Sequence, residues 1–151
     1  ASEKTFYGIV ETATKPLLAS HSNAYALCPA KRNLKDEQIK IIASTGGVIG
    51  MNAWPAFIDE KTPSAEKLAD HVDYMVDLVG IDHVGCGFDF CDFLDDNALS
   101  FAESGQVSTK DLEDATKVRN FTDILKRRGY DEEALEKIMY KNMERLLYKT
   151  L

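Results

Sequence analysis

Apolar positions along the chain follow two spacings in turn, and this alternation predicts helices separated by short strands. In residues 2–14, 33–45 and 62–79 apolar side chains recur every three or four positions, the period of an amphipathic helix. Between them lie compact apolar runs at 16–20, 48–52 and 83–88, which we interpret as buried strands. Two further helical patterns follow, at 118–128 and from Asp131 onward.

Residues with distinct backbone preferences mark the expected ends of these elements. Pro16 ends the first helix, because the residue before a proline avoids the helical conformation. Asn33 is the predicted N-cap of the second helix, and Thr62-Pro63 the predicted start of the third. Glycines are expected to stop the helices at Gly46-Gly47, Gly80 and Gly129.

The order of elements predicts an α/β fold with a parallel sheet, because single helices between successive strands form right-handed βαβ units. The strands lack strict apolar–polar alternation, as expected when both faces of a sheet are covered. Three strands are fewer than the eight of a (β/α)8 barrel, which takes about 250 residues. Because the chain opens inside a helical pattern, we favour part of a barrel over a small three-stranded domain.

Composition and charge narrow the class of protein. With 151 residues, 44% hydrophobic and 28% charged, the chain is expected to form one globular domain. A net charge of -7 and the lack of a basic stripe argue against nucleic acid as a partner. No run of 18 apolar residues occurs, which argues against a membrane span. The odd cysteines Cys28, Cys86 and Cys91 have no CxxC spacing and predict reduced thiols in a cytoplasmic protein.

Polar side chains follow each predicted strand. His21 comes after the first strand, Asn52 ends the second, and Asp89 comes after the third. Functional residues of parallel α/β folds gather at the carboxyl ends of strands, so we expect these groups at one rim. A histidine, an amide and a carboxylate suit a metal site or acid–base chemistry.

Three residues are the candidates for function, each with a structural alternative. His21 is a candidate zinc ligand, and a loop-anchoring histidine is an equal alternative. Asp89 is a candidate catalytic residue, and its alternative is a helix N-cap or a loop hydrogen bond. Arg32 suits bidentate binding of a substrate carboxylate. Its alternative is a surface arginine at a helix start, where a cation is slightly unfavourable.

Other polar residues are expected to be structural. His71, at the edge of a packed helix face, and His83, at the start of a strand, should have structural roles, and Asn142 should bond buried backbone groups. The acidic run at Asp92, Asp95 and Asp96 should be a solvated loop. A catalytic zinc needs about three protein ligands, and neither HExxH nor HxH occurs in the chain. Further metal ligands would have to come from outside it.

The stretch Ser20-His21-Ser22-Asn23-Ala24-Tyr25, at a predicted strand end, resembles the S-H-S-x-A-Y motif of the membrane (renal) dipeptidase family of zinc peptidases. The similarity continues through Cys28 to Asn33 and resumes at 70–74, 84–90, 127–130 and the last helix. It covers essentially the whole chain, and several motifs in the family's order are more specific than any one alone.

The resemblance implies a (β/α)8 barrel of which residues 1–151 are the C-terminal half, with the three strands as its sixth, seventh and eighth. It implies two zinc ions at the C-terminal rim and a zinc-activated hydroxide that attacks the carbonyl of a dipeptide substrate. His21 matches a zinc ligand of the family, and Arg32 matches the arginine that binds the substrate's free carboxylate. Asp89 matches the aspartate that contacts the substrate amine and handles protons.

Departures from the family pattern limit what the chain does alone. The family's H-x-D motif, bridging glutamate and fifth-strand histidine have no counterpart, and G-x-D-F-D-G here reads Gly87-Phe88-Asp89-Phe90-Cys91-Asp92. We therefore expect a zinc dipeptidase that is active only with the N-terminal half of the barrel, the isolated chain being inactive. The alternative is a non-catalytic half-barrel that binds or self-associates through its open sheet edges.

Overall fold

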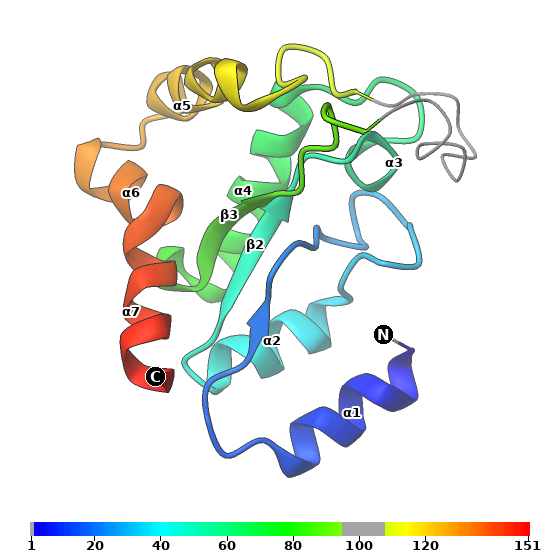
Figure 1. Ribbon diagram of the computed structural model, residues 1–151, viewed down its shortest axis with the longest axis vertical. Helices are drawn as coiled ribbons and strands as arrows, with labels where there is room; N and C mark the ends of the chain where they lie inside the picture. The colour runs from blue at the N-terminus through cyan, green and yellow to red at the C-terminus, as the bar shows by residue number, and fades with distance from the viewer. Residues whose placement is uncertain (1, 95–107) are drawn as a thin grey trace.

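The computed structural model describes residues 2–94 and 108–151, and it shows an α/β fold around a parallel sheet (Figure 1). The three strands are β1 (Leu18–Ala19), β2 (Val48–Asn52) and β3 (Val84–Phe88), in the order β1-β2-β3. Both strand pairs are parallel. The predicted fold class, helices alternating with parallel strands, is confirmed.

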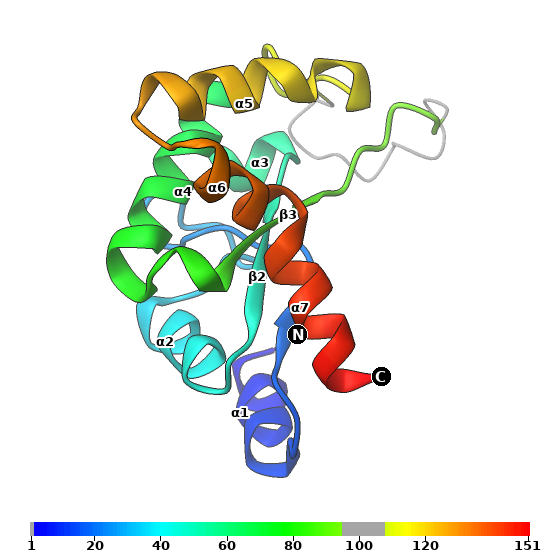
Figure 2. The ribbon, with the colours of Figure 1, turned by 90° about the vertical axis from the view of Figure 1, so that its left-hand side faces the viewer.

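Helices connect and cover the strands. Figure 2 shows α2 and α4 on one side of β2 and α7 on the other. A π-helical segment, η3, interrupts the last predicted helix between α6 and α7. The helical elements are α1 (Glu3–Thr12), α2 (Asp36–Ser44), α3 (Pro55–Ile58), α4 (Ala65–Val79), η1 (Ile81–His83), η2 (Ala115–Lys117), α5 (Val118–Arg127), α6 (Glu132–Glu136), η3 (Lys137–Lys141) and α7 (Asn142–Thr150).

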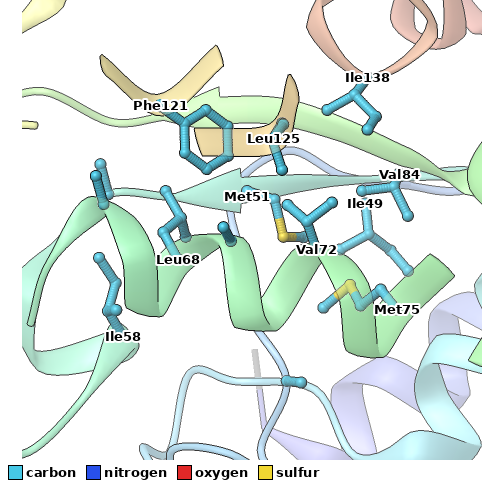
Figure 3. Close-up of a cluster of buried hydrophobic side chains, with 14 of the residues drawn as sticks. Ile49, Met51, Ile58, Leu68, Val72, Met75, Val84, Phe121, Leu125 and Ile138 are labelled. Atoms are coloured by element: carbon cyan, nitrogen blue, oxygen red, sulfur yellow. The ribbon is translucent and has the colours of Figure 1, made fainter. Parts of the chain in front are cut away.

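The core forms where α4 packs on β2 and β3 (Figure 3). Leu68, Val72 and Met75 recur along one face of α4 and are fully buried, as their spacing predicts. Each such side chain contributes roughly 1.5–3 kcal/mol when it leaves water. From other elements, the cluster includes Ile49, Met51, Val84, Phe121, Leu125 and Ile138. This packing fixes where the carboxyl ends of β2 and β3 lie.

Two predicted helix starts are wrong. The N-cap of α2 is Lys35, whose backbone N–H donates to the Gln38 side chain at 3.0 Å, while Asn33 is buried in the preceding loop. The N-cap of α4 is Ser64, whose Oγ accepts from the backbone N–H of Lys67 at 3.3 Å. In both places the predicted cap residue has hydrogen bonds in the loop before the helix. The Asn33 side chain bonds backbone carbonyls, and the Thr62 N–H donates to Asp59.

The first strand also differs from its prediction. β1 has two residues, and Leu18 is 43% exposed, so it is not the buried strand that the apolar run 16–20 predicts. Among the described residues it pairs only with β2, and its second edge has no strand partner. His83 lies in η1, one residue before β3 rather than within it.

The structure tests part of what was predicted about the cysteines, membrane spans and the acidic loop. Cys28, Cys86 and Cys91 are free thiols, whereas the cytoplasmic location stays a prediction. In residues 2–94 and 108–151, no helix is long and apolar enough to cross a membrane. Asp92 is exposed, as expected of a solvated loop, and Asp95 and Asp96 lie outside the described residues.

Candidate functional site

His21 is placed by a close crossing of backbones at the carboxyl ends of the strands. The carbonyl oxygen of Ser20 would lie 2.2 Å from a Cβ on Gly50 and 1.9 Å from one on Gly87. Only glycine admits such an approach. The backbone N–H of Ser22 also donates to the Gly50 carbonyl at 2.8 Å. The segment that carries His21 therefore lies across β2 and β3, close to the strand that ends before Asp89.

A hydrogen bond joins His21 to Arg32. Nη2 of Arg32 lies 2.9 Å from Nε2 of His21. A guanidinium group can only donate, so Nε2 must be the unprotonated, accepting nitrogen of the ring. Nδ1 then carries the proton and donates to Oγ of Ser20 at 2.9 Å. The ring is thus in the tautomer whose Nε2 carries the lone pair, which here accepts from Arg32 and which a metal ligand requires.

The loop that carries Arg32 is fixed at both ends. Oγ of Ser22 donates to the Arg32 carbonyl at 2.7 Å, and the isolated bridge between Ala24 and Leu34 closes the loop. The guanidinium carbon lies 5.5 Å from the centre of the Phe57 ring, within the range of a cation–π contact. Arg32 is exposed, so its remaining N–H groups face solvent at the rim.

Asp89 follows β3 with a left-handed backbone, φ 64°. The register between β2 and β3 shifts at this end: Met51 pairs with Cys86, but Asn52 pairs with Phe88. Such a bulge redirects the residues that follow it. Asp89 is exposed, and its Oδ2 accepts from Nδ2 of Asn52 at 3.4 Å. No helix begins here, so of the two structural alternatives the loop hydrogen bond is the one observed.

Three buried asparagines tie the loops of this rim together. Nδ2 of Asn23 donates to the carbonyls of Asn52 and Phe57 at 2.9 and 3.0 Å. Nδ2 of Asn33 donates to the carbonyls of Cys28 and Phe57 at 2.9 and 2.8 Å. Sequence reasoning missed this network, although asparagines near the carboxyl ends of two neighbouring strands, at 23 and 52, were a usable signal. Phe57 is thus held by two amides beneath the Arg32 guanidinium.

The residues expected to be structural have structural surroundings. His71 is buried: its Nδ1 accepts from the Ala24 N–H at 3.1 Å and its Nε2 lies 2.9 Å from the Ile58 carbonyl. Burial lowers the pKa of His71. Nδ1 of His83 lies 2.8 Å from the Gly47 carbonyl. Nδ2 of Asn142 donates to the carbonyls of Ile81 and Val84 at 2.8 Å each. All three predictions are confirmed.

A cavity of about 760 Å³ opens beside the free edge of β1. Its walls come from α1, from β1 and from the loop that follows β1 into α2. His21 and Arg32 lie on this wall, so the hydrogen-bonded pair is reached from the cavity. The apolar part of the lining is formed by Phe6, Ile9, Leu17, Leu18, Ala19, Leu34 and Ile42.

A metal site is not complete in the described part of the chain. Within residues 2–94 and 108–151, no group of three or more histidine, cysteine or acidic side chains is close enough to hold a metal ion. His21 offers one suitable nitrogen. Burial raises the pKa of the Cys86 thiol to about 12.

Comparison with known proteins places the chain in a family. The model of "Membrane dipeptidase (Peptidase family M19)" matches residues 1–150. "Uncharacterized protein in pqqA 5'region" of Klebsiella pneumoniae is 36% identical over 97% of this chain and 51% of that protein. "Dipeptidase tcpJ" of Claviceps purpurea is 32% identical over 97% of this chain and 32% of that protein.

A solved structure agrees with these sequences. It is a metallo peptidase from Rhodobacter sphaeroides, liganded with a phosphinate mimic of the dipeptide L-Ala-D-Ala. Its TM-score is 0.84 at 30% identity, over 99% of this chain and 40% of that one. The chain thus spans about half or less of the length of these relatives. On the family match and the agreement in fold, the chain belongs to the membrane dipeptidase family, peptidase family M19.

Proposed function

We propose that this chain supplies part of the active site of a zinc-dependent dipeptidase. The observation that supports this most directly is the His21–Arg32 pair, 2.9 Å apart at the carboxyl end of a parallel sheet. The sheet belongs to a chain of the M19 family, and a similar metallo peptidase of known structure is liganded with a phosphinate mimic of a dipeptide. The pair combines a candidate metal ligand with a candidate receptor for a carboxylate. A dipeptidase site needs both, one near the scissile peptide bond and the other at the free carboxylate of the substrate.

Each candidate residue has a role that its surroundings support. Arg32 binds the free carboxylate of the substrate, because its guanidinium lies over the Phe57 ring and is exposed to the cavity. Asp89 contacts the substrate amine and moves a proton at the leaving nitrogen, because its carboxylate is exposed at the same end of the sheet. His21 is a metal ligand through Nε2.

The donor set fits zinc in kind but not in number. Nε2 of His21 is unprotonated, as ligation requires, and the other ligands must come from residues outside those described here. When bound, zinc would act as a Lewis acid and would lower the pKa of a water that attacks the peptide carbonyl. Two ions in the complete site follow from the family resemblance.

We further propose that residues 1–151 form the C-terminal half of a (β/α)8 barrel. The free edge of β1 and the cavity beside it support this, because an unpaired edge strand next to an apolar wall offers a place for another strand. Leu18, 43% exposed here, would be covered by that strand. The partner is then the N-terminal half of the barrel, and a second copy of this chain is the alternative occupant.

Hydrolysis of dipeptides with and without a free C-terminal carboxylate tests the proposed dipeptidase function. The chain is expressed together with the segment that completes the barrel, loaded with zinc, and assayed on dipeptides and on the same dipeptides with an amidated C-terminus. We expect Arg32→Met to raise KM for the free dipeptides by about 100-fold, a loss of about 3 kcal/mol typical of a charge-assisted contact. Hydrolysis of the amides should hardly change.

Lys31→Met is the matched control, since Lys31 is the neighbouring exposed cation and lines the same cavity. It should leave both KM values within about twofold, as expected of a solvated charge. Equal losses in the two variants would refute the carboxylate role of Arg32. A zinc-loaded, assembled protein that cleaves neither substrate would refute the dipeptidase and leave the non-catalytic module as the function.

A further inference from the structure

Asn52 stands between the core and Asp89. It is the last residue of β2, and its side chain is fully buried. Its Oδ1 accepts from the Trp54 backbone N–H at 2.6 Å. An amide N–H can only donate, so this bond determines which end of the Asn52 side chain is the oxygen. Nδ2 must then face the other way, and the group that it meets is Oδ2 of Asp89, at 3.4 Å.

The backbone of Asn52 is held equally firmly. Oδ1 of Asn23 accepts from the Asn52 N–H at 2.9 Å, and Nδ2 of Asn23 donates to the Asn52 carbonyl at 2.9 Å. Both the oxygen and the nitrogen of the Asn23 side-chain amide therefore bond the backbone of Asn52. The backbone groups and Oδ1 of Asn52 all have short bonds to buried partners. Only the donor at Nδ2 is directed toward the exposed rim.

The Asp89 side chain is held by fewer contacts than the Asn52 side chain. Asp89 is exposed, it follows the bulge in β3, and its backbone is left-handed, with φ 64°. Among residues 2–94 and 108–151, Asn52 is the one hydrogen-bond partner found for its carboxylate. A distance of 3.4 Å is long, and such contacts in ligand-free sites shorten when a substrate fixes the acid.

We propose that Asn52 is a positioning residue for Asp89. Its Nδ2 donor holds one carboxylate oxygen, so that the other is directed to the substrate. The inference rests on the proposed dipeptidase function for its kinetic consequence, but the contact itself does not. The buried amide does not touch the substrate: it limits the rotation of an exposed carboxylate, and misplacement of a catalytic group by about 1 Å can cost about 100-fold in rate.

The contact is tested first without activity. In protein labelled with 15N-asparagine, the Asn52 side-chain NH2 signals should shift as Asp89 ionises, and this shift should vanish in Asp89→Asn. The NH2 signals of Asn142, which donate to the carbonyls of Ile81 and Val84, are the internal control and should not respond. Asn52 signals that ignore the charge of Asp89 would overturn the proposal. Asp89 is exposed, so Asp89→Asn is expected to leave the fold intact.

Kinetics of the complete zinc enzyme then test the consequence. Asn52→Asp has nearly the same shape and can still accept from Trp54, but it replaces the donor facing Asp89 with an acceptor. We expect kcat to fall at least tenfold, KM to change less than twofold, and the acidic limb of the kcat profile to move to higher pH, because a second carboxylate raises the pKa of the first.

Asn142→Asp makes the same chemical change in a buried asparagine at the opposite end of β3. Whatever it costs in stability, the folded fraction should keep the wild-type pH profile. A pH profile of Asn52→Asp that matches the wild type would overturn the positioning role. Coupled NMR signals combined with an unchanged kcat would keep the contact but remove Asp89 from the reaction, so the two proposals can fail separately.

Discussion

Arg32 donates to the same nitrogen of His21 that a metal ion would bind, with Nη2 and Nε2 2.9 Å apart. One lone pair cannot serve both, so the contact observed here and metal ligation by His21 exclude each other. On the proposed function, zinc binding would therefore release Arg32. The guanidinium also lies over Phe57 and beside the cavity, where a substrate carboxylate could take the place of the imidazole.

This competition predicts a gain in metal affinity when Arg32 loses its charge. In the assembled protein without substrate, Arg32→Met should tighten zinc binding about tenfold, because a hydrogen bond to a charged group of about 1.5 kcal/mol no longer has to be broken. Titration against a chromophoric chelator measures it. Lys31→Met removes a neighbouring charge without this contact and should change affinity less than twofold. Equal gains in both variants would show a general charge effect instead.

Gly87→Ala should damage the fold at the candidate site. A Cβ at this position would lie 1.9 Å from the Ser20 carbonyl, so the backbone carrying His21 would have to move. We expect a loss of about 2 kcal/mol or more in the free energy of unfolding, as for overpacked sites. The control is Gly8→Ala in α1, where a Cβ meets nothing within 4 Å. It should stabilise the protein by roughly 0.5–1 kcal/mol. Urea unfolding of the two variants settles the difference.

His71 should make stability fall in acid. Burial lowers its pKa in the folded state, so below the ordinary value near 6.5 the unfolded chain binds a proton that the folded protein does not. The free energy of unfolding should then decrease with falling pH, with a slope of at most about 1.4 kcal/mol per pH unit from this group. The loss ends at the lowered pKa of the folded state.

The variant His71→Gln isolates this contribution. Glutamine keeps an acceptor and a donor for Ala24 and Ile58 but does not titrate. Its free energy of unfolding should vary less between pH 7 and pH 5 than that of the wild type, whatever its value at pH 7. The same slope in both proteins would mean that another group causes the acid sensitivity.

Arg128 should contribute more to stability than a typical surface arginine. Although burial opposes its charge, hydrogen bonds to Glu66, Asp73 and Asp70 raise the pKa of Arg128. Its Nη1 lies 2.6 Å from Asp73 and its Nη2 lies 2.9 Å from Glu66, which joins the end of α5 to α4. Arg128→Met leaves these carboxylates facing one another and should cost about 1–2 kcal/mol after allowance for solvent screening.

Arg119 is the matched control for that variant. It lies on α5 as well, is 89% exposed, and is 3.9 Å from Asp123. Arg119→Met should leave the denaturation midpoint unchanged, and the loss in Arg128→Met should shrink in high salt. Similar losses for the two arginines would contradict a special role of the α4–α5 contact.

The sequence by itself determined the class of fold, the order of strands and helices and the core face of α4. These depend on local periodicity, which is read from neighbours along the chain. His21, Arg32 and Asp89 were also identified as candidates from the sequence, through their places after strands and through the family motifs. The structural role of Asn142 followed from the need of a buried amide for partners, and those of His71 and His83 from their places away from the carboxyl ends of the strands.

Only the tertiary structure decided which of these groups meet. The bond between His21 and Arg32, the amides of Asn23 and Asn33 on Phe57, and the support of Asp89 by Asn52 join loops that are distant in sequence. Tertiary contacts also outweighed a local preference. Asn33 had the chemistry of a helix cap, but its amide donates to the carbonyls of Cys28 and Phe57 instead. Satisfying a buried polar group in three dimensions outweighs a local capping preference, and no pattern along the chain records that balance.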